Sequence, residues 1–540
     1  MSVSLPLYTA QQVVELDRLV IQHEGVSAAL LMKRAGRCAF ERLLAQWPQT
    51  AALHIFCGSG SNGGDGYVLA ALAKQRNLQV SVWFIGEPAT DTAALRARDY
   101  ATQEGLVLGE DIRPFNEAAF IDSQLMQDPR TVIVDALLGT GTEGELRPLM
   151  REAVNAINTA KQRYGWSVLA IDIPTGVNPD TGATGDDVIQ SDVTISFIGR
   201  KQGLYTGAGR ACSGQRVFSS LDVEEEWLHL VNPASQTLAL SALLPQLPER
   251  HSNAHKGDCG HLLVVGGDTG VGYGYGGAPL MAAQMALRTG AGLVSLATQP
   301  TFVNAALSRQ PELMVAGIES GQALLPLLPR ATAIVIGTGL GQSAWSEQLL
   351  YQVLDHATQP LVIDADALRL LSQARFASLS AVAQQDRQWV LTPHAGEAAA
   401  LLDCSVADIE ADRFAAAQEI QQRYGGAVIL KGAGTVIATA DGQLSICDAG
   451  NAGMASGGMG DVLSGLVGAL LVQGMSVNDA AKLAALLHST AADIAVKTMG
   501  LRSLLATDLI PAVQKLLNEP AFNEILSGEP LGHTAKSNGG

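Results

Sequence analysis

The stretch Leu53-His-Ile-Phe-Cys57, continued by Gly58-Ser-Gly-Ser-Asn-Gly-Gly-Asp-Gly66, decides the fold of the first half of this 540-residue chain. A short apolar run that ends in a glycine-rich loop, with a helix expected from about Tyr67, is typical of a strand-loop-helix unit. Helices are also expected over residues 9–45, and further apolar runs predict strands at 80–85, 131–135, 168–172 and 193–197. Strands that alternate with helices predict an α/β domain whose parallel sheet is covered on both faces.

A second α/β series follows residues 222–254, which hold an acidic cluster at 224–226, several prolines and no clear strand. We place the domain boundary there, with domains at 1–225 and 226–520, and expect the polar tail at 521–540 to be disordered. Two long helices, at 461–473 and 477–497, close the second domain. Its strands are expected at 262–265, 293–297, 333–336, 361–363, 390–391, 428–430 and 436–438.

Composition limits the kinds of partner that the protein is expected to have. The net charge of −17 argues against a general nucleic-acid or anionic-membrane binder, because both need a positive surface. The six cysteines are scattered without a C-x-x-C pair, which fits a reducing compartment. No signal peptide or membrane-spanning apolar run is apparent. We therefore expect a cytoplasmic protein with no nucleic-acid or membrane partner.

The first glycine-rich loop has two interpretations. Gly58, Gly60 and Gly63 match G-x-G-x-x-G between a strand and a helix, so a phosphate at the helix N-terminus is plausible. Glu87, just past the next strand, then fits the ribose-binding acid of a dinucleotide dehydrogenase. However, Asn62 is unusual for such a loop, because it places a polar side chain where a pyrophosphate needs the backbone close.

Polar residues end three of the predicted strands at one edge of the sheet. Asn62, Asp135 and Thr175 carry hard oxygen donors, which suit an alkali or alkaline-earth cation. Each of them alone is also a common cap of a helix or turn. Because ligands of open α/β sheets bind outside the carboxyl ends of the strands, three such residues together favour a binding site.

Residues 8–220 resemble the NAD(P)H-hydrate epimerase family. The motifs that carry the resemblance are Tyr8-Thr-Ala-Gln-Gln-Val13, Asn62-Gly-Gly-Asp-Gly66, Asp135-Ala-Leu-Leu-Gly-Thr-Gly141 and Asp172-Ile-Pro-Thr-Gly-Val177. The resemblance implies a Rossmann-like, three-layer fold and an enzyme that interconverts the R and S forms of hydrated nicotinamide cofactor at C6. It also implies K⁺ bound by Asn62, Asp135 and Thr175, and proton transfer by Asp172. The substrate contacts that it implies are Ser61, Asn62, Gly63, Gly64, Asp65, Gly139, Thr140, Gly141, Thr142, Glu143, Gly144, Glu145 and Asp172.

The second domain ends in a longer glycine-rich loop, Gly450-Asn-Ala-Gly-Met-Ala-Ser-Gly-Gly-Met-Gly-Asp461, with an apolar helix expected directly after it. Free N–H groups at the start of that helix favour an anion, and Asp461 beside them is a natural base for taking a proton from a hydroxyl. The alternative is a capping Asp. Similarly, His394 is either a structural histidine or a ligand contact, and Lys431 either caps a sheet edge or meets phosphate oxygens.

Residues 240–515 resemble the ADP-dependent NAD(P)H-hydrate dehydratase family, which implies a ribokinase-like fold. The motifs are the 451–461 loop, Lys431-Gly-Ala-Gly-Thr435, Thr392-Pro-His394-Ala-Gly-Glu397 and Gly337-Thr-Gly-Leu-Gly341. By matching, the adenine nucleotide is held by Lys431, Gly432, Ala433, Gly434, Thr435 and Gly460. The contacts to the hydrated cofactor are Ala278, Gly339, His394 and Asp461.

Together the two resemblances imply a fused repair enzyme, an epimerase (isomerase) joined to a dehydratase (lyase). Asp461 is expected to deprotonate the C6 hydroxyl for attack on the terminal phosphate of ADP, after which loss of phosphate restores NADH or NADPH and leaves AMP. The expected ligands are NADHX, NADPHX and ADP with Mg²⁺, and a homo-oligomer is expected. The alternatives are a ribokinase-like small-molecule kinase, a non-catalytic nucleotide-sensing module and a dehydrogenase.

Overall fold

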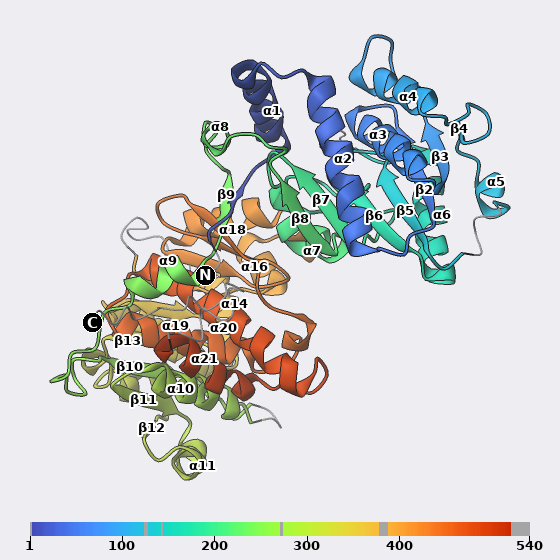
Figure 1. The fold of residues 1–540 in the computed structure, drawn as a ribbon. Helices are drawn as coiled ribbons and strands as arrows, with labels where there is room; N and C mark the ends of the chain where they lie inside the picture. Colours follow the sequence, from blue (N-terminus) through green and yellow to red (C-terminus); the bar gives the residue numbers. More distant parts are fainter. Residues whose placement is uncertain (1–2, 124–127, 142–143, 271–273, 377–386, 520–540) are drawn as a thin grey trace, which may run out of the picture. The chain divides into compact units, whose positions relative to one another are not determined.

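The computed structural model describes residues 3–123, 128–141, 144–270, 274–376 and 387–519. The chain divides into two compact units, drawn in blue to green and in green to red in Figure 1. One unit is Pro6–Ser235, and the other begins at Gln236 and includes the residues that precede Pro6. The dividing point lies beyond the predicted boundary at 225/226. The predicted tail at 521–540 lies outside the described residues.

The N-terminal unit is built on a fully parallel sheet in the order β4-β3-β2-β5-β6-β7-β8. This order reverses direction between β2 and β5, the kind of position at which open α/β sheets bind ligands. The strands are β2 (Ala52–Gly58), β3 (Gln79–Ile85), β4 (Ile112–Pro114), β5 (Thr131–Ala136), β6 (Ser167–Ile171), β7 (Val193–Phe197) and β8 (Gln215–Ser219), and a short strand β1 (Pro6–Leu7) opens the chain.

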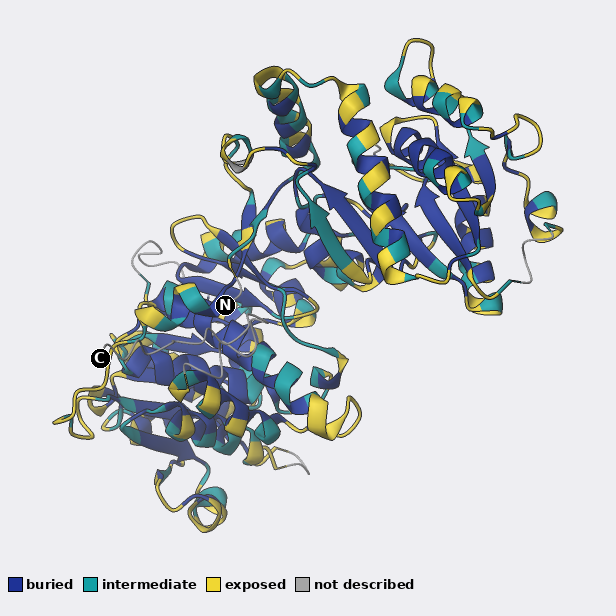
Figure 2. Cartoon of the chain, in the orientation of Figure 1, coloured by how far each residue is buried: buried dark blue, intermediate teal, exposed yellow. Residues whose placement is uncertain are grey.

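Helices cover both faces of this sheet, which confirms the predicted three-layer α/β domain. Its helices are α1 (Ala10–Glu24), α2 (Ala28–Gln46), α3 (Ser61–Gln75), α4 (Ala93–Gln103), α5 (Glu117–Ile121), α6 (Pro148–Tyr164), α7 (Gly207–Cys212) and α8 (Glu225–Leu228). One core cluster joins α1 to α4 with one set of strand residues, and a second joins α5 and α6 with the alternate set. Figure 2 shows the resulting pattern, with buried strands and helices such as α2 that are buried on one side only.

Helix α3 begins six residues earlier than predicted, at Ser61 and not near Tyr67. The predicted loop residues 61–66 are therefore the first turns of a helix, in spite of their three glycines. Close packing explains the difference, because a Cβ added to Gly63 would lie 1.9 Å from the backbone oxygen of Gly58. Only glycine lets this helix begin so close to the end of β2, and tertiary packing outweighs the low helix propensity of glycine.

The C-terminal unit also contains one large sheet, in the order β9-β18-β17-β16-β15-β14-β13-β10-β11-β12. In this order, all strands from β16 through β10 to β12 are parallel to their neighbours within that run, and β17 is antiparallel to both of its neighbours. The strands are β9 (Ser235–Thr237), β10 (His261–Val265), β11 (Leu293–Thr298), β12 (Met314–Gly317), β13 (Ala333–Ile336), β14 (Leu361–Ile363), β15 (Trp389–Leu391), β16 (Ala427–Leu430), β17 (Thr435–Ala438) and β18 (Leu444–Cys447).

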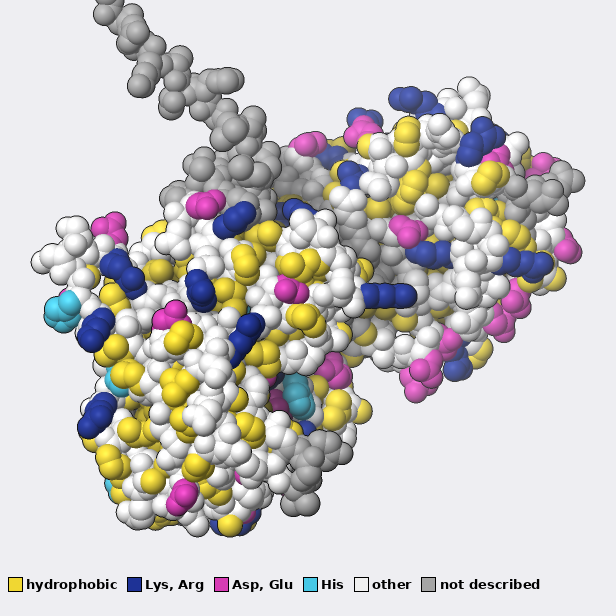
Figure 3. All heavy atoms as spheres, turned by 90° about the horizontal axis from the view of Figure 1, so that it is seen from below, with side chains coloured by type: hydrophobic (Ala, Val, Ile, Leu, Met, Phe, Trp, Pro, Cys, Tyr) yellow, Lys and Arg dark blue, Asp and Glu magenta, His cyan; other side chains and the backbone are white. Residues whose placement is uncertain are grey.

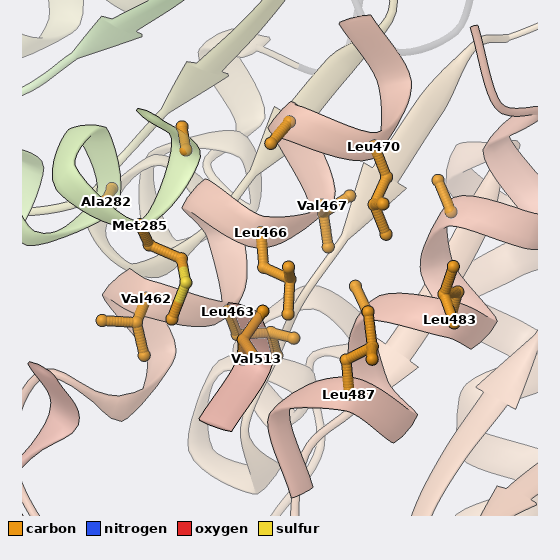
Figure 4. Packing of buried hydrophobic residues seen from close by; sticks show 14 of the residues in the cluster. Ala282, Met285, Val462, Leu463, Leu466, Val467, Leu470, Leu483, Leu487 and Val513 are labelled. Atoms are coloured by element: carbon orange, nitrogen blue, oxygen red, sulfur yellow. The ribbon is translucent and has the colours of Figure 1, made fainter. Parts of the chain in front are cut away.

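The core of this unit lies where α10, α19, α20 and α21 pack on one face of the sheet (Figure 4). Leu463, Leu466 and Leu470 of α19 lie at helical spacing in the centre of that cluster. The helices are α9 (Leu240–Leu243), α10 (Gly277–Thr289), α11 (Val303–Arg309), α12 (Gly321–Leu324), α13 (Ala344–His356), α14 (Ala365–Leu371), α16 (Ala395–Leu402), α17 (Val406–Ala411), α18 (Arg413–Tyr424), α19 (Met459–Val472), α20 (Val477–Met499) and α21 (Leu509–Asn518).

The strands predicted from apolar runs are all present in both units, with ends that differ by at most one residue. The strands that were not predicted are β1, β4, β8, β9, β12 and β18, which are short or partly exposed. One of them, β9, lies within residues 222–254, where we expected no strand. None of the described helices combines the length and the hydropathy needed to cross a bilayer. On the face seen in Figure 3, Lys and Arg side chains are dispersed among Asp and Glu.

Candidate active sites

In the N-terminal unit, a cavity of about 810 Å³ lies at the carboxyl ends of β2, β5 and β6, where the strand order reverses. The structure brings most of the predicted substrate contacts to its wall. Gly63, Gly64 and Gly144 do not line it, and Thr142 and Glu143 lie outside the described residues. The predicted residues that line it are Ser61, Asn62, Asp65, Gly139, Thr140, Gly141, Glu145 and Asp172.

Asn62, Asp135 and Thr175 are brought together as predicted. Thr175 donates to the buried carboxylate of Asp135 from both its backbone N–H and its hydroxyl, each at 2.8 Å. The Asn62 Nδ2 donates to the backbone oxygen of Leu138 at 2.9 Å, and the backbone N–H of Leu138 donates to Thr175 Oγ1 at 3.2 Å. The Asn62 Oδ1 is buried, and no donor among the described residues reaches it. Burial raises the pKa of Asp135 to about 6, against the hydrogen bonds from Thr175 and Leu137.

These three side chains fit a desolvated monovalent cation. An orphaned amide oxygen, a carboxylate and a hydroxyl are the hard ligands that such an ion prefers. A buried carboxylate without a cationic partner is costly, and a cation beside it removes that cost. The described residues contain no group of three or more His, Cys, Asp or Glu that is arranged to hold a metal ion, so a site here combines one carboxylate with neutral oxygens.

Asp172 directly follows the carboxyl end of β6, and its backbone is strained. Its φ is 69°, and Ile198, which also lines the cavity, has a φ of 60°. A β-branched residue in this left-handed region is a true outlier, and such strain concentrates at functional sites. The Asp172 carboxylate forms an ion pair with Lys201, whose side chain is only 1% exposed. Lys201 also donates to the backbone oxygen of Phe197 at 3.3 Å.

Two further carboxyl groups line the same cavity, Asp17 from α1 and Asp65 from α3. Burial raises the pKa of Asp17 to about 6, with the charge of Lys201 opposing and that of Asp172 adding to the shift. Burial raises the pKa of Asp65 well above its ordinary value, and the neighbouring charges of Asp172 and Asp17 act in the same direction. Glu145 and Arg147 also line it, so the cavity holds four carboxyl groups, one ammonium group and one guanidinium group.

Sequence reasoning did not assign Asp17 or Lys201 to this site. Neither residue lies at a predicted strand end beside a glycine-rich loop, which was the signal used. Lys201 lines the cavity, and its segment is held by Tyr8, with hydrogen bonds from Tyr8 N to Arg200 O and from Gln202 N to Tyr8 O. In contrast, the predicted ribose acid Glu87 is 62% exposed and pairs with Arg98, so the dehydrogenase interpretation loses its key side chain.

In the C-terminal unit, Asp461 lies in the first turn of α19 and does not cap it. The N-cap is Gly458, with a φ of 90° and no side-chain capping bond, and the helix begins at Met459. The capping alternative for Asp461 is therefore wrong. Burial raises the pKa of Asp461 to about 7; the charges of Asp364 and Asp366 add to the shift and that of Lys431 opposes it. A carboxyl group that titrates near neutrality suits general acid–base chemistry.

Lys431 follows β16, as predicted, but it lies within a buried charge network and not at an open sheet edge. Its Nζ lies 2.8 Å from Asp364 Oδ1 and 3.6 Å from Glu397 Oε2. Burial works against the charged form, but these carboxylates raise the pKa of Lys431. Burial by itself would raise the pKa of Asp364. The charge of Lys431 and the hydrogen bonds with Lys431, Ser464 and Thr392 outweigh it, so this pKa is lowered. A Cβ on Gly460 would lie 3.3 Å from Lys431 Nζ, which places the glycine loop against this network.

Asp364 and Arg413 are the residues of this site that sequence reasoning missed. Asp364 lies directly after β14, in an Asp364-Ala-Asp366 segment without the glycines that marked the other strand ends. Arg413 is buried at the start of α18, and its Nη2 donates to the backbone oxygens of Leu430 and Lys431 at 3.2 and 3.0 Å. It holds the Lys431–Thr435 turn in place, and its role depends on contacts between distant segments.

His394 is the N-cap of α16. Its Nδ1 accepts from the N–H groups of Gly396 and Glu397 at 3.0 and 3.1 Å, and its Nε2 lies 3.1 Å from Glu397 Oε1. The structural interpretation of His394 is thus confirmed, while its 48% exposed side chain leaves the expected substrate contact as a prediction. Gly339 and Ala278 lie close together, since a Cβ on Gly339 would lie 3.1 Å from the Ala278 side chain.

A cavity of about 970 Å³ in this unit lies away from the Asp461 network. It is lined by the far ends of α10 and α19, including Gly290 and Gln473, and contains none of the predicted nucleotide or substrate contacts. The chemistry that the residues suggest is therefore concentrated at the carboxyl ends of β14 to β16 and the start of α19, and not in this cavity.

Comparison with known proteins gives matches over both units. Residues 28–203 match the family model described as YjeF-related protein N-terminus, and residues 262–515 match the one described as NAD(P)H-hydrate dehydratase. The ADP/ATP-dependent NAD(P)H-hydrate dehydratase from Bacillus subtilis, co-crystallized with ATP/Mg²⁺, is 27% identical, with a TM-score of 0.46, and the match covers 52% of this chain and 96% of that chain.

Two curated relatives match almost the whole chain. The bifunctional NAD(P)H-hydrate repair enzyme Nnr of Coxiella burnetii is 41% identical over 513 residues, which cover 95% of this chain and 99% of the relative. The enzyme of the same name from Escherichia coli is 39% identical over 520 residues, which cover 96% of this chain and 95% of the relative. This chain therefore belongs to the family of bifunctional NAD(P)H-hydrate repair enzymes.

Proposed function

We propose that each compact unit carries one of the two repair activities. The N-terminal unit epimerises the R and S forms of NADHX and NADPHX, and the C-terminal unit dehydrates the S form with ADP as co-substrate. The observation that carries this proposal is that each unit holds a buried acid–base cluster at the carboxyl edge of its sheet, Asp172 with Lys201 in one and Asp461 with Lys431 in the other. Joining the two activities lets both forms of the hydrate reach the dehydratase.

In the epimerase unit, Asp172 is the proton-transfer group for inversion at C6, and the 61–65 and 139–145 segments hold the substrate. Potassium held by Asn62, Asp135 and Thr175 supplies a fixed positive charge beside these segments. The orphaned Asn62 Oδ1 and the buried Asp135 carboxylate support this site. The chain's own part is to present the three oxygens from the ends of α3, β5 and β6 without rearrangement.

The potassium site is tested by measuring epimerase rates in potassium, sodium and tetramethylammonium chloride at equal ionic strength. We expect activation by potassium, and we expect Asn62→Ala to lose the response to potassium. Asn155→Ala, on the exposed side of α6, is the matched control and should respond like the parent protein. A potassium response that survives in Asn62→Ala contradicts this ligand set.

In the dehydratase unit, Asp461 accepts the proton of the C6 hydroxyl, and that oxygen attacks the terminal phosphorus of ADP. Hydroxide is a poor leaving group, whereas a phosphate ester leaves readily, so elimination then restores the dihydronicotinamide ring and releases phosphate beside AMP. Lys431 lies next to Asp461 and carries the positive charge that the transferred phosphoryl group needs. The Lys431–Thr435 turn and Gly460 hold the nucleotide, and Ala278, Gly339 and His394 contact the hydrated cofactor.

Magnesium is proposed to accompany ADP, bound mainly to phosphate oxygens. Asp364 and Glu397 already contact Lys431, at 2.8 and 3.6 Å. No described group of three or more metal-binding side chains is present, and Mg²⁺ is commonly held through substrate phosphates and water.

The decisive experiment is incubation of the purified protein with mixed R and S hydrate, with and without ADP. We expect complete conversion to reduced cofactor, followed by its near-ultraviolet absorbance, only when ADP is present. Conversion that stops at the S fraction contradicts the epimerase, and a stable phosphorylated alcohol as product favours the ribokinase-like kinase. A nucleotide-sensing module gives no conversion.

We also propose that the protein acts in the cytoplasm as a homo-oligomer. All six cysteines are free, which supports a reducing compartment. Light scattering of the purified chain measures the oligomeric state, and a monomer at working concentration contradicts that part of the proposal.

A further inference from the structure

The epimerase cavity contains more acid–base groups than the proposed function uses. Asp172 alone removes a proton, but inversion at C6 also requires a bond at that carbon to break and re-form. Asp17, Asp65, Asp172 and Lys201 come from four separate segments and all line the cavity. Glu145 and Arg147 also line it, so two cationic groups face four carboxyl groups, and Lys201 is engaged by Asp172.

We propose that Asp17 is a second catalytic residue of the epimerase, the acid that works opposite Asp172, and that Lys201 is a positioning residue that holds the Asp172 carboxylate in place. This inference rests on the proposed role of Asp172. It is carried by the shared cavity and by the ion pair, which engages Asp172, whereas no ion pair of Asp17 or Asp65 is found among the described residues.

Asp17 is better placed for proton transfer than Asp65. The Asp65 side chain lies on the buried N-terminal turn of α3, where burial and two neighbouring carboxylates raise its pKa well above the ordinary value. Asp17 is partly exposed on α1, and its proton is held less tightly. An acid is most effective when its pKa lies near the working pH.

The reaction step balances without any further reactant. Asp172 takes the proton of the C6 hydroxyl, the O–H electron pair forms a carbonyl, and the bond from C6 to the ring nitrogen breaks with its electron pair on nitrogen. Asp17 supplies the proton that this nitrogen takes up. The opened chain is an aldehyde that rotates about its bond to the neighbouring ring carbon and presents its other face. Closure reverses both proton transfers, so Asp17 and Asp172 return to their starting states.

Lys201 keeps the cavity electrically balanced through this exchange. It lies beside Asp172 and its charge also acts on Asp17, so one positive charge faces one carboxylate both before and after the proton transfers. The segment that carries it is fixed by the strained Ile198 and by its pairing with Tyr8. The charged groups that face Asp17 are Lys201 from the end of β7, Asp172 from β6 and Asp65 from α3, and Glu145 and Arg147 also line the cavity.

The test compares Asp17→Asn, Asp17→Glu and Glu15→Gln in the full-length protein. Glu15 lies on the same helix in an exposed pair with Arg18, so Glu15→Gln is the matched control for loss of a carboxylate. We expect Asp17→Asn to lower epimerase kcat by about 10²- to 10⁴-fold with little change in KM, Asp17→Glu to recover part of the rate, and Glu15→Gln to match the parent. Thermal melting checks that each variant is folded. If Asp17→Asn does not fold, the rate of Asp17→Glu relative to the parent tests the role of Asp17.

The pH profile separates a catalytic role from a structural one. The acid is active when protonated, so kcat/KM of the parent should fall as pH rises through the pKa of about 6, and this limb should be absent in Asp17→Asn. Lys201→Met should lower epimerase kcat with little change in KM, because the Asp172 carboxylate loses the cation that holds it, and Lys201→Arg should recover part of the rate. An unchanged limb in Asp17→Asn, or an unchanged kcat in Lys201→Met, contradicts the role given to that residue.

Isotope retention tests the ring opening. Hydrate labelled with ¹⁸O at C6 should keep its label when it is epimerised in unlabelled water, and loss of label at the rate of epimerisation overturns the step. Asp172→Asn keeps the two levels of proposal apart. If that variant remains active, the proposed function of Asp172 fails; if it is inactive while Asp17→Asn retains the parent rate, only the present inference fails.

Discussion

Replacing Asp364 by Asn tests whether Asp461 is the base of the dehydratase. Burial, with the charges of Asp364 and Asp366, raises the pKa of Asp461 to about 7, and Lys431 opposes that shift. Asp364→Asn removes one of the like charges and frees Lys431, which is otherwise paired with Asp364 at 2.8 Å. Both consequences favour the ionised form of Asp461. The acidic limb of the dehydratase pH profile should therefore move to lower pH.

The magnitudes follow from the position of that limb. With a pKa of about 7, roughly one tenth of Asp461 is ionised at about pH 6 and roughly nine tenths at about pH 8, so kcat/KM of the parent should rise about tenfold between them. Removing a neighbouring like charge in a partly desolvated site should lower the limb by about one to two pH units. Lys431→Met should move the limb in the opposite direction, because Lys431 lowers the pKa of Asp461.

The assay follows near-ultraviolet absorbance of reduced cofactor formed from the S hydrate at saturating ADP, from about pH 5 to about pH 9. Asp355→Asn, on the exposed end of α13, makes the same chemical change away from the site and should leave the limb in place. A parent profile that is flat between about pH 6 and about pH 8 refutes the assignment of Asp461. So does a limb that moves upward in Asp364→Asn.

Three further predictions concern stability. In chemical unfolding, Gly63→Ala should destabilise the N-terminal unit by at least about 3 kcal/mol, since the added Cβ would lie 1.9 Å from a backbone oxygen. Gly60→Ala is the control: its Cβ would have nothing within 4 Å, so it should cost less than about 1 kcal/mol. His54 is buried, and its pKa is lowered from 6.5 to about 3, so below about pH 6.5 the unfolded chain binds a proton that the folded chain does not. The free energy of unfolding should therefore fall by up to about 4–5 kcal/mol as pH drops from about 6.5 to about 3. Unfolding of His54→Gln should depend less on pH, and an equal dependence contradicts this. Gly465→Ala should separate α10 from α19, because its Cβ would lie 2.0 Å from the Ala282 oxygen, and a melting temperature equal to that of Gly277→Ala, where space is open, contradicts that packing.

Much of the fold was predictable from local patterns. Apolar runs such as those that became β13 and β14 have the predicted bounds, because buried parallel strands must be continuously apolar and are bounded by turn residues. Strands such as β8 and β12 were missed, since their partly exposed residues lack that signal. The start of α3 was wrong, because glycine was read as loop where close packing against β2 requires it within a helix.

The candidate sites divide in the same way. Residues beside glycine-rich segments, including Asn62, Asp172, Lys431 and Asp461, were predicted from the sequence, because a parallel sheet places successive carboxyl ends at one edge. Asp17, Lys201 and Asp364 carry no such local signal. They enter the sites through pairing of Tyr8 beside Arg200 and through a hydrogen-bonded ion pair between β14 and β16.

The sequence by itself determined the α/β class of both units, the edge at which each site lies, and the resemblance that names the chemistry, because periodicity and motif spacing are local properties of the chain. Only the tertiary structure decided which carboxyl groups have raised pKa values. Burial and the nearest charge set that balance, and for Asp17, Asp65 and Asp461 both depend on segments that lie far away along the chain.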